Sequence, residues 1–212
     1  MSEVKSPDIN LTEESEIYMA PKTRLTLEIV GAAIFGALSL VLSLYVVPIL
    51  PRTPEGLAYF DPVSIVWVTC FLIFGPRSGI LCCLIGMLCL FPFDPFTPIG
   101  PLMKFSATLS LIIIPILILK LYKRDSSNLN SQKLKQPINY ILTGILGTIT
   151  RIIVMVYLNI VVWVWYLGLS PQGLIQYLIV VIFINALTSL WDLGIPYAIV
   201  FSTKLNQWLE IW

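Results

Sequence analysis

The chain has 212 residues, of which 57% are hydrophobic and only 12% are charged, with a net charge of +1. This composition is typical of proteins with several membrane spans, and the small net charge excludes the basic surface that nucleic-acid binding requires. Histidine is absent, and the four cysteines lie inside apolar runs without CxxC spacing. We therefore expect buried cysteines, no metal centre and no cofactor.

Six hydrophobic runs follow a polar N-terminal segment. Residues 1–24 have no secretory signal, and we interpret them as a mobile cytoplasmic tail. The runs cover about residues 25–47, 62–74, 78–91, 101–122, 137–166 and 174–201, within a predicted membrane domain of residues 25–204. The second and third runs are short for a ~30 Å hydrocarbon core, so they are thin spans or continue into the flanking loops. Residues 205–212 form a predicted interfacial segment.

Lysine and arginine are distributed unevenly between the loops. With the N-terminus inside, ten of the 13 basic residues fall on the cytoplasmic side, and Arg52 alone lies in an outer loop. The other two, Lys104 and Arg151, fall within the runs. Cytoplasmic loops of membrane proteins are enriched in these residues. We therefore predict an all-α integral membrane protein, a six-transmembrane-helix bundle with its N- and C-termini in the cytoplasm.

Small residues line one face of the first run. Ala32, Gly36 and Ser39 are spaced i, i+4 and i+7, and Ala33 and Ala37 lie beside them. Small residues allow two membrane helices to approach closely. Two interpretations stay open at this point: packing inside the protein's own bundle, or a docking face for a partner protein.

Two opposite charges occur in the last two runs. At ~1.5 Å per residue, Arg151 lies ~20 Å and Asp192 ~15 Å above the inner ends of their helices. An unpaired charge in a membrane span costs at least ~2.5–3.5 kcal/mol. We predict an intramembrane ion pair between the two residues, with a proton or ligand relay as the alternative.

Other polar residues gather toward the outer side of the predicted bundle. The predicted substrate-binding residues are Asp61, Asp94, Lys104, Asn159, Trp163, Asn185 and Thr188. Separately, the aromatic residues fit an interfacial belt and the asparagines fit hydrogen bonds between helices. Together they predict an outward-facing pocket for a small, flat, polar molecule. A lysine in this pocket would suit a ligand that carries a carboxylate or phosphate.

Sequence motifs of enzymes are missing. The chain has no Gly-x-Ser-x-Gly elbow, no His-Glu-x-x-His, no Walker loop and no acidic cluster for Mg²⁺. We therefore expect that the protein is not an enzyme, and that any ATP-driven step needs another subunit.

Four passages carry a resemblance to a known family. They are DP…FGPRSGIL over residues 61–81, TPIGPLMKF over 97–105 before a helix with Pro115, YLNIVVWVWY around Asn159 and FINALTSL around Asn185. In order and spacing, the chain over roughly residues 25–205 resembles a substrate-binding S component of an energy-coupling factor (ECF) vitamin transporter, nearest to the riboflavin type. It departs at Pro101 and Lys104, where riboflavin proteins tend to have Glu and Asn, and at Thr188, where they tend to have Lys.

The resemblance implies a subunit of the cell membrane that binds a vitamin, riboflavin being the nearest candidate, from outside. It also implies docking on a transmembrane T component driven by two cytoplasmic ATPases, with the small-residue face of the first run as the docking face. Two alternatives are an autonomous or structural multi-pass subunit and an intramembrane lipid-modifying enzyme. An autonomous permease would need an inverted repeat, and none is visible.

Overall fold

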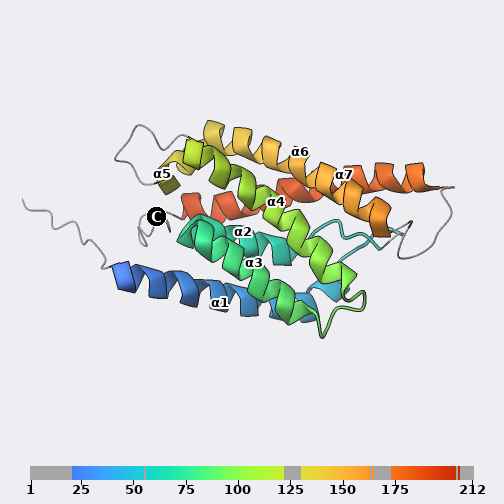
Figure 1. Cartoon of the computed structure of the whole chain (residues 1–212), viewed down its shortest axis with the longest axis horizontal. Helices are drawn as coiled ribbons and strands as arrows, with labels where there is room; N and C mark the ends of the chain where they lie inside the picture. The colour runs from blue at the N-terminus through green and yellow to red at the C-terminus, as the bar shows by residue number, and fades with distance from the viewer. Residues whose placement is uncertain are drawn as a thin grey trace, which may run out of the picture.

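The computed structural model describes residues 21–54, 56–121, 130–162, 164, 173–203 and 205. These residues form a helical bundle (Figure 1). Its elements are α1 (Pro21–Tyr45), the 3-10 turn η1 (Val47–Ile49), α2 (Pro62–Phe74), α3 (Pro76–Leu90), α4 (Ile99–Leu121), α5 (Asn130–Lys135), α6 (Pro137–Val161), α7 (Leu174–Tyr197) and the π-helical turn η4 (Ala198–Ser202). The predicted tail lies outside the described residues except for 21–24, which are helical, and the C-terminal segment lies outside them except for residue 205.

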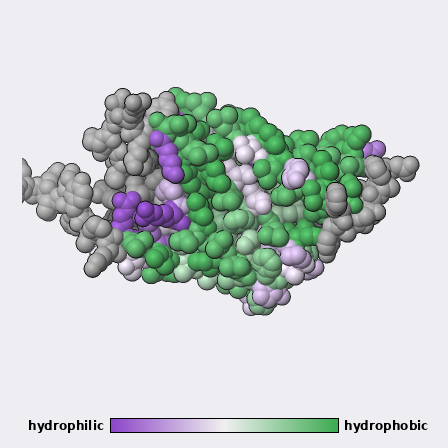
Figure 2. Space-filling view, in the orientation of Figure 1, coloured by the Kyte–Doolittle hydropathy of each residue, from purple (hydrophilic) through white to green (hydrophobic). Residues whose placement is uncertain are grey.

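Within the described residues, four helices are long and apolar enough to cross a membrane. They cover Thr23–Ile49, Ile99–Leu121, Pro137–Val161 and Leu174–Ser202. The face of the molecule in Figure 2 is hydrophobic over the middle of the bundle, and hydrophilic residues gather toward the left end of the view. The other two apolar helices, α2 and α3, have 13 and 15 residues. At ~1.5 Å per residue they are ~20 and ~23 Å long, less than the ~30 Å hydrocarbon core.

Helix α2 lies at the centre of the bundle. All of its residues from Pro62 to Ile73 are buried, in contact with α1, α3, α4 and α7. The helix begins at Asp61, whose side chain accepts a hydrogen bond from the Val63 backbone N–H at 3.1 Å. It ends at Gly75, whose φ of 96° favours glycine. Because every face is buried, its sequence is apolar except for Ser64 and Thr69 and shows no amphipathic period.

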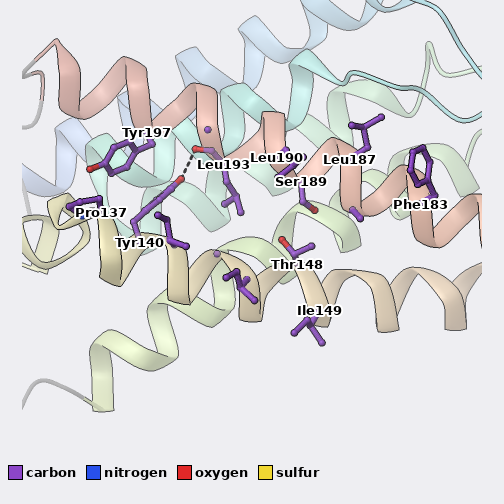
Figure 3. A pocket seen from close by; sticks show the side chains of 15 residues that line it. Pro137, Tyr140, Thr148, Ile149, Phe183, Leu187, Ser189, Leu190, Leu193 and Tyr197 are labelled. Carbon is purple, nitrogen blue, oxygen red and sulfur yellow. Dashed lines mark hydrogen bonds between the residues drawn. The ribbon is translucent and has the colours of Figure 1, made fainter.

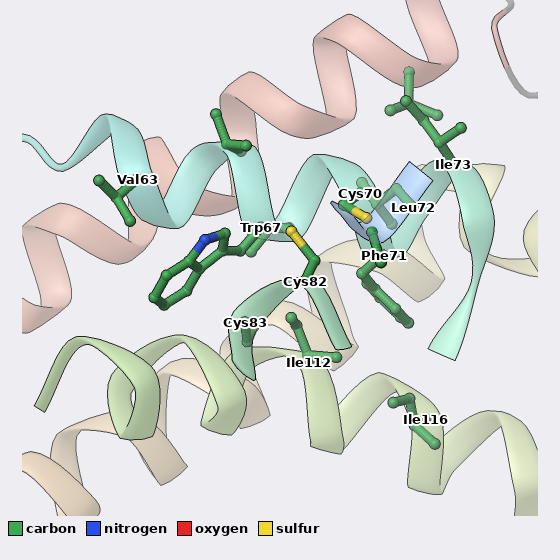
Figure 4. Packing of buried hydrophobic residues seen from close by; sticks show 14 of the residues in the cluster. Val63, Trp67, Cys70, Phe71, Leu72, Ile73, Cys82, Cys83, Ile112 and Ile116 are labelled. Atoms are coloured by element: carbon green, nitrogen blue, oxygen red, sulfur yellow. The ribbon is translucent and has the colours of Figure 1, made fainter. Parts of the chain in front are cut away.

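The main hydrophobic core surrounds α2. Trp67 and Phe71 of α2 pack with Cys82 and Cys83 of α3 and with Ile112 of α4 (Figure 4). Three of the four cysteines are buried and the fourth is half-buried, and all four are free thiols. The expectation that the cysteines serve as small core side chains is confirmed for Cys70, Cys82 and Cys83.

Helix α1 packs against α3 through the small residues of its predicted stripe. Ala32, Gly36 and Ser39 are buried, and a Cβ atom on Gly36 would lie 2.8 Å from Ile85 Cγ2. On α3, a Cβ atom on Gly86 would lie 2.7 Å from Ser39 Oγ. These three residues therefore pack inside the protein's own bundle, which was one of the two open interpretations.

The remaining helices form the other side of the bundle, with α6 between α4 and α7. Gly147 brings α6 close to α4, since a Cβ atom there would lie 3.4 Å from Leu111 Cα. Near the opposite face of α6, the Tyr140 hydroxyl donates to the Leu193 carbonyl of α7 at 2.8 Å. This arrangement places the polar side chains of α4, α6 and α7 next to the start of α2.

Candidate functional site

Polar side chains connect α2 to α4. Lys104 Nζ lies 3.5 Å from Asp61 Oδ2, with the two side chains 20% and 13% exposed. One turn further along both helices, the hydroxyls of Ser64 and Thr108 share a hydrogen bond of 2.9 Å. Asp61 therefore has two roles, because it caps α2 and pairs with the lysine. The structure thus brings together two residues that the sequence predicts for substrate binding.

A second set of polar contacts connects α6 to α7. Arg151 Nη1 donates to Asp192 Oδ2 at 2.5 Å, and Arg151 Nε donates to Asn185 Oδ1 at 3.1 Å. The side chains of Arg151 and Asp192 are 6% and 0% exposed. This is the ion pair that the sequence predicts from the depth of the two charges. The other carboxylate oxygen, Asp192 Oδ1, is buried and has no hydrogen-bond partner among the described residues.

The two sets lie within electrostatic range of each other inside the bundle. Asp61 and Lys104 both interact electrostatically with Asp192. We call Asp61, Lys104, Arg151, Asn185 and Asp192 the central polar cluster. Its two positive and two negative charges balance, as expected for charges inside a membrane protein, where an unpaired charge is costly. A ligand that separates Lys104 from Asp61 must accept a hydrogen bond from the lysine and donate one to the aspartate.

A small apolar cluster adjoins the central polar cluster, one helical turn from Lys104 on α4, from Arg151 on α6 and from Asn185 on α7. Ala107 of α4, Met155 of α6 and Val181 of α7 form its buried part. Next to it, the Tyr177 hydroxyl donates to Asn159 Oδ1 at 2.6 Å, and Asn159 Nδ2 donates to the Met155 carbonyl at 2.7 Å. Asn159 is only 2% exposed, so its amide groups are both used inside the protein.

The loop between η1 and α2 covers the end of this apolar cluster. Leu57 packs against the apolar cluster of α4, α6 and α7. Its N–H donates to Thr53 Oγ1 at 3.1 Å, and its carbonyl accepts from the Thr53 N–H at 2.8 Å. Gly56 has a φ of 86°, which allows the tight turn, and Arg52 Nη1 donates to its carbonyl at 3.2 Å. The loop is therefore a compact, internally bonded turn that carries Leu57 into the bundle.

Two other predicted residues make hydrogen bonds within their own segments. The Asp94 carboxylate accepts from the Phe96 N–H at 2.8 Å within its own loop, and the Thr188 hydroxyl donates to the Ile184 carbonyl at 2.9 Å. Trp163 lies outside the described residues. Sequence reasoning did not assign Leu57, Ser64 or Thr108, because single hydroxyls and leucines in an apolar chain form no pattern.

The five residues predicted for partner docking divide into two groups. Ala32, Gly36 and Ser39 are buried against α3, whereas Ala33 and Ala37 are exposed. They lie on a face of α1 with the exposed apolar side chains of Ile29, Val30, Ile34, Leu38 and Val41.

The apolar helices and the polar cluster between them are those of a polytopic membrane protein with a polar site inside its helical bundle. A family comparison is more specific, because residues 27–202 match the model of the ECF transporter substrate-specific component. The chain therefore belongs to this family. It is the substrate-specific membrane subunit of an ECF transporter, which takes a small-molecule substrate and docks with T and ATPase components, and it is not an enzyme. Neither the curated proteins nor the solved structures gave a match.

Proposed function

We propose that this subunit binds a vitamin or a related small molecule from the outer side, at the central polar cluster. The observation that carries the proposal is the balanced set of four charges inside a membrane bundle. Ionisable groups in membrane spans are rare and mark substrate or ion sites. Asp192 Oδ1 adds a second support, since a buried acceptor without a donor costs free energy that a ligand N–H or O–H would recover.

The proposed topology has six membrane helices with both termini in the cytoplasm. Ten basic residues on one side against Arg52 on the other support it. Helices α2 and α3 are short for a bilayer, but α2 is enclosed by other helices and needs no full-length lipid contact. In this topology, Asn159 and Tyr177 lie outward of the central polar cluster, and Lys120 lies at the inner end of α4.

The cluster favours a ligand that both donates and accepts hydrogen bonds. Lys104 is already paired with Asp61, so a ligand acceptor at the lysine must be matched by a donor at the aspartate. Riboflavin meets this requirement, because its ring system carries an N–H group between two carbonyls. We propose Lys104, Asn159, Asn185 and the orphan oxygen of Asp192 as ligand contacts. The two asparagines would exchange an internal hydrogen bond for one to the ligand. Trp163, outside the described residues, stays a predicted contact.

Entry to the site would require the loop of residues 51–60 to move. Leu57 fills the outer space between α4, α6 and α7, and the loop's internal hydrogen bonds allow it to move as a unit. We propose that this loop is the outer lid, and that it packs against a bound ligand through Leu57.

The proposed docking face for the T component is the exposed side of α1. Ala33 and Ala37 are one helical turn apart on this side, and exposed branched side chains flank them. Small residues on a helix face allow a partner helix to approach closely in a membrane.

The proposal is tested by purifying the full chain in mild detergent and identifying any bound small molecule by absorbance and mass spectrometry. Riboflavin and other vitamins are then titrated in turn by calorimetry. We expect one of them to bind tightly and in a 1:1 ratio. An empty preparation that binds none of these compounds would contradict the proposed function.

A further inference from the structure

An apolar groove runs between α6 and α7 (Figure 3). Its volume is about 620 Å³. Pro137 and Tyr197 line one end, and Ile149 and Phe183 line the other. Gly194 forms part of the wall, and a Cβ atom there would meet nothing within 4 Å. The groove is therefore open space on the hydrophobic surface of a membrane protein.

The groove is about one lipid leaflet long. Its lining on α6 runs from Pro137 to Ile149, which is ~18 Å of helix at ~1.5 Å per residue. Half of a ~30 Å hydrocarbon core is ~15 Å. Helix α6 continues to Val161 beyond the groove. A partner membrane helix would need a groove along the whole span, whereas one acyl chain needs only this length.

Positive charge marks one end of the groove. Helix α5 precedes Pro137 and carries Lys133 and Lys135 in its last turn. The Tyr197 hydroxyl of the groove donates to the Lys135 carbonyl at 2.9 Å, and Leu134 is 1% exposed, so α5 is fixed beside the groove. The sequence from residue 130 to residue 150 contains no Asp or Glu. Lysines at a membrane surface attract anionic lipid head groups.

We propose that this groove binds an anionic glycerophospholipid from the leaflet that meets α5. One acyl chain lies between α6 and α7, and the phosphate lies at Lys133 and Lys135. The groove lining includes none of the five residues of the central polar cluster, and the inference does not depend on which solute the protein carries.

The direct test uses phosphatidylglycerol with a photoactivatable group in its acyl chain. The full chain is reconstituted in phosphatidylcholine vesicles with a trace of this probe, irradiated, and the labelled peptides are identified by mass spectrometry. We expect label on residues 137–149 and 186–197 at several times the level found around Ile153 and Ile179, which are 64% and 62% exposed. A phosphatidylcholine probe should label these regions evenly.

Two variants separate the acyl-chain site from the head-group site. Gly194→Leu fills the groove from a position with free space, so it should fold normally and lose the preferential labelling. Lys133→Gln with Lys135→Gln should reduce the preference for phosphatidylglycerol over phosphatidylcholine. The matched controls are Ile179→Phe on the exposed surface of α7 and Arg77→Gln in the first turn of α3, and neither should change the labelling.

Three outcomes would overturn the proposal. The first is even labelling of all exposed helices by the phosphatidylglycerol probe. The second is unchanged preferential labelling in well-folded Gly194→Leu protein. The third is a groove that stays unlabelled and forms crosslinks between protein chains, which would make it a protein interface.

Discussion

Replacing Arg151 with methionine removes the only charged partner that contacts Asp192 in the described structure. The aspartate is fully buried, and its second oxygen already lacks a partner. Breaking one side of a buried ion pair costs ~3–5 kcal/mol, which is two to more than three decades in the folded-to-unfolded ratio. Asn185 loses a donor as well, at a further ~0.5–1.5 kcal/mol. We therefore expect Arg151→Met to be among the most destabilising single changes in the chain.

The matched variant replaces both charges. Arg151→Met with Asp192→Leu leaves no buried charge, and hydrophobic replacement of a buried pair is often neutral or stabilising. The free energy of unfolding, measured in mild detergent for the four members of the double-mutant cycle, should therefore recover by ~3 kcal/mol in the double variant. If the double variant is no more stable than Arg151→Met alone, the pairing does not explain why these two charges are tolerated.

Three further predictions concern the core, the lid and the docking face. Gly86→Leu should destabilise the protein by ~1–3 kcal/mol or more, because the new side chain would meet Ser39 and Trp67. Gly194→Leu should leave the stability unchanged, because no atom lies within 4 Å of a Cβ there. Equal melting temperatures of the two variants would argue against close packing of α1 on α3. Leu57→Ala should speed ligand dissociation about 10-fold in stopped-flow fluorescence, because a loss of ~1.4 kcal/mol of lid packing changes the rate tenfold. An unchanged dissociation rate would show that the loop is not the lid. Ala33→Leu should block co-purification with the T component while ligand binding persists, because this residue is exposed; loss of both would assign it to the protein's own fold.

The ion pair could be predicted from the sequence because membrane helices have a fixed rise per residue. The depths of Arg151 and Asp192 follow from their distances to the helix ends, and adjacent antiparallel helices then bring the two charges to one level. The positions of the long membrane spans could be predicted as well, because a long apolar run in a protein is rarely anything other than a membrane span. Both predictions depend on distance along one axis only.

Contacts across the bundle could not be predicted in the same way. The small-residue stripe of α1 indicates a close approach, but not whether α3 or another protein approaches. The apolar sequence of α2 has no polar face, so its enclosure by four helices is visible only in the structure. The contact between Ser64 and Thr108 joins residues 44 positions apart, and no local pattern marks either hydroxyl. Rotation of each helix about its axis was the missing information.

The most direct test of the account compares Lys104→Met with Lys120→Met for the ligand identified in the purified protein. Both lysines lie on α4, one in the central polar cluster and one in the exposed last turn. Losing a charged hydrogen bond to the ligand costs ~1.5–3 kcal/mol, so calorimetry should show a ~10–150-fold weaker Kd for Lys104→Met and an unchanged Kd for Lys120→Met. Unchanged affinity in well-folded Lys104→Met protein would contradict the placement of the ligand at the central polar cluster.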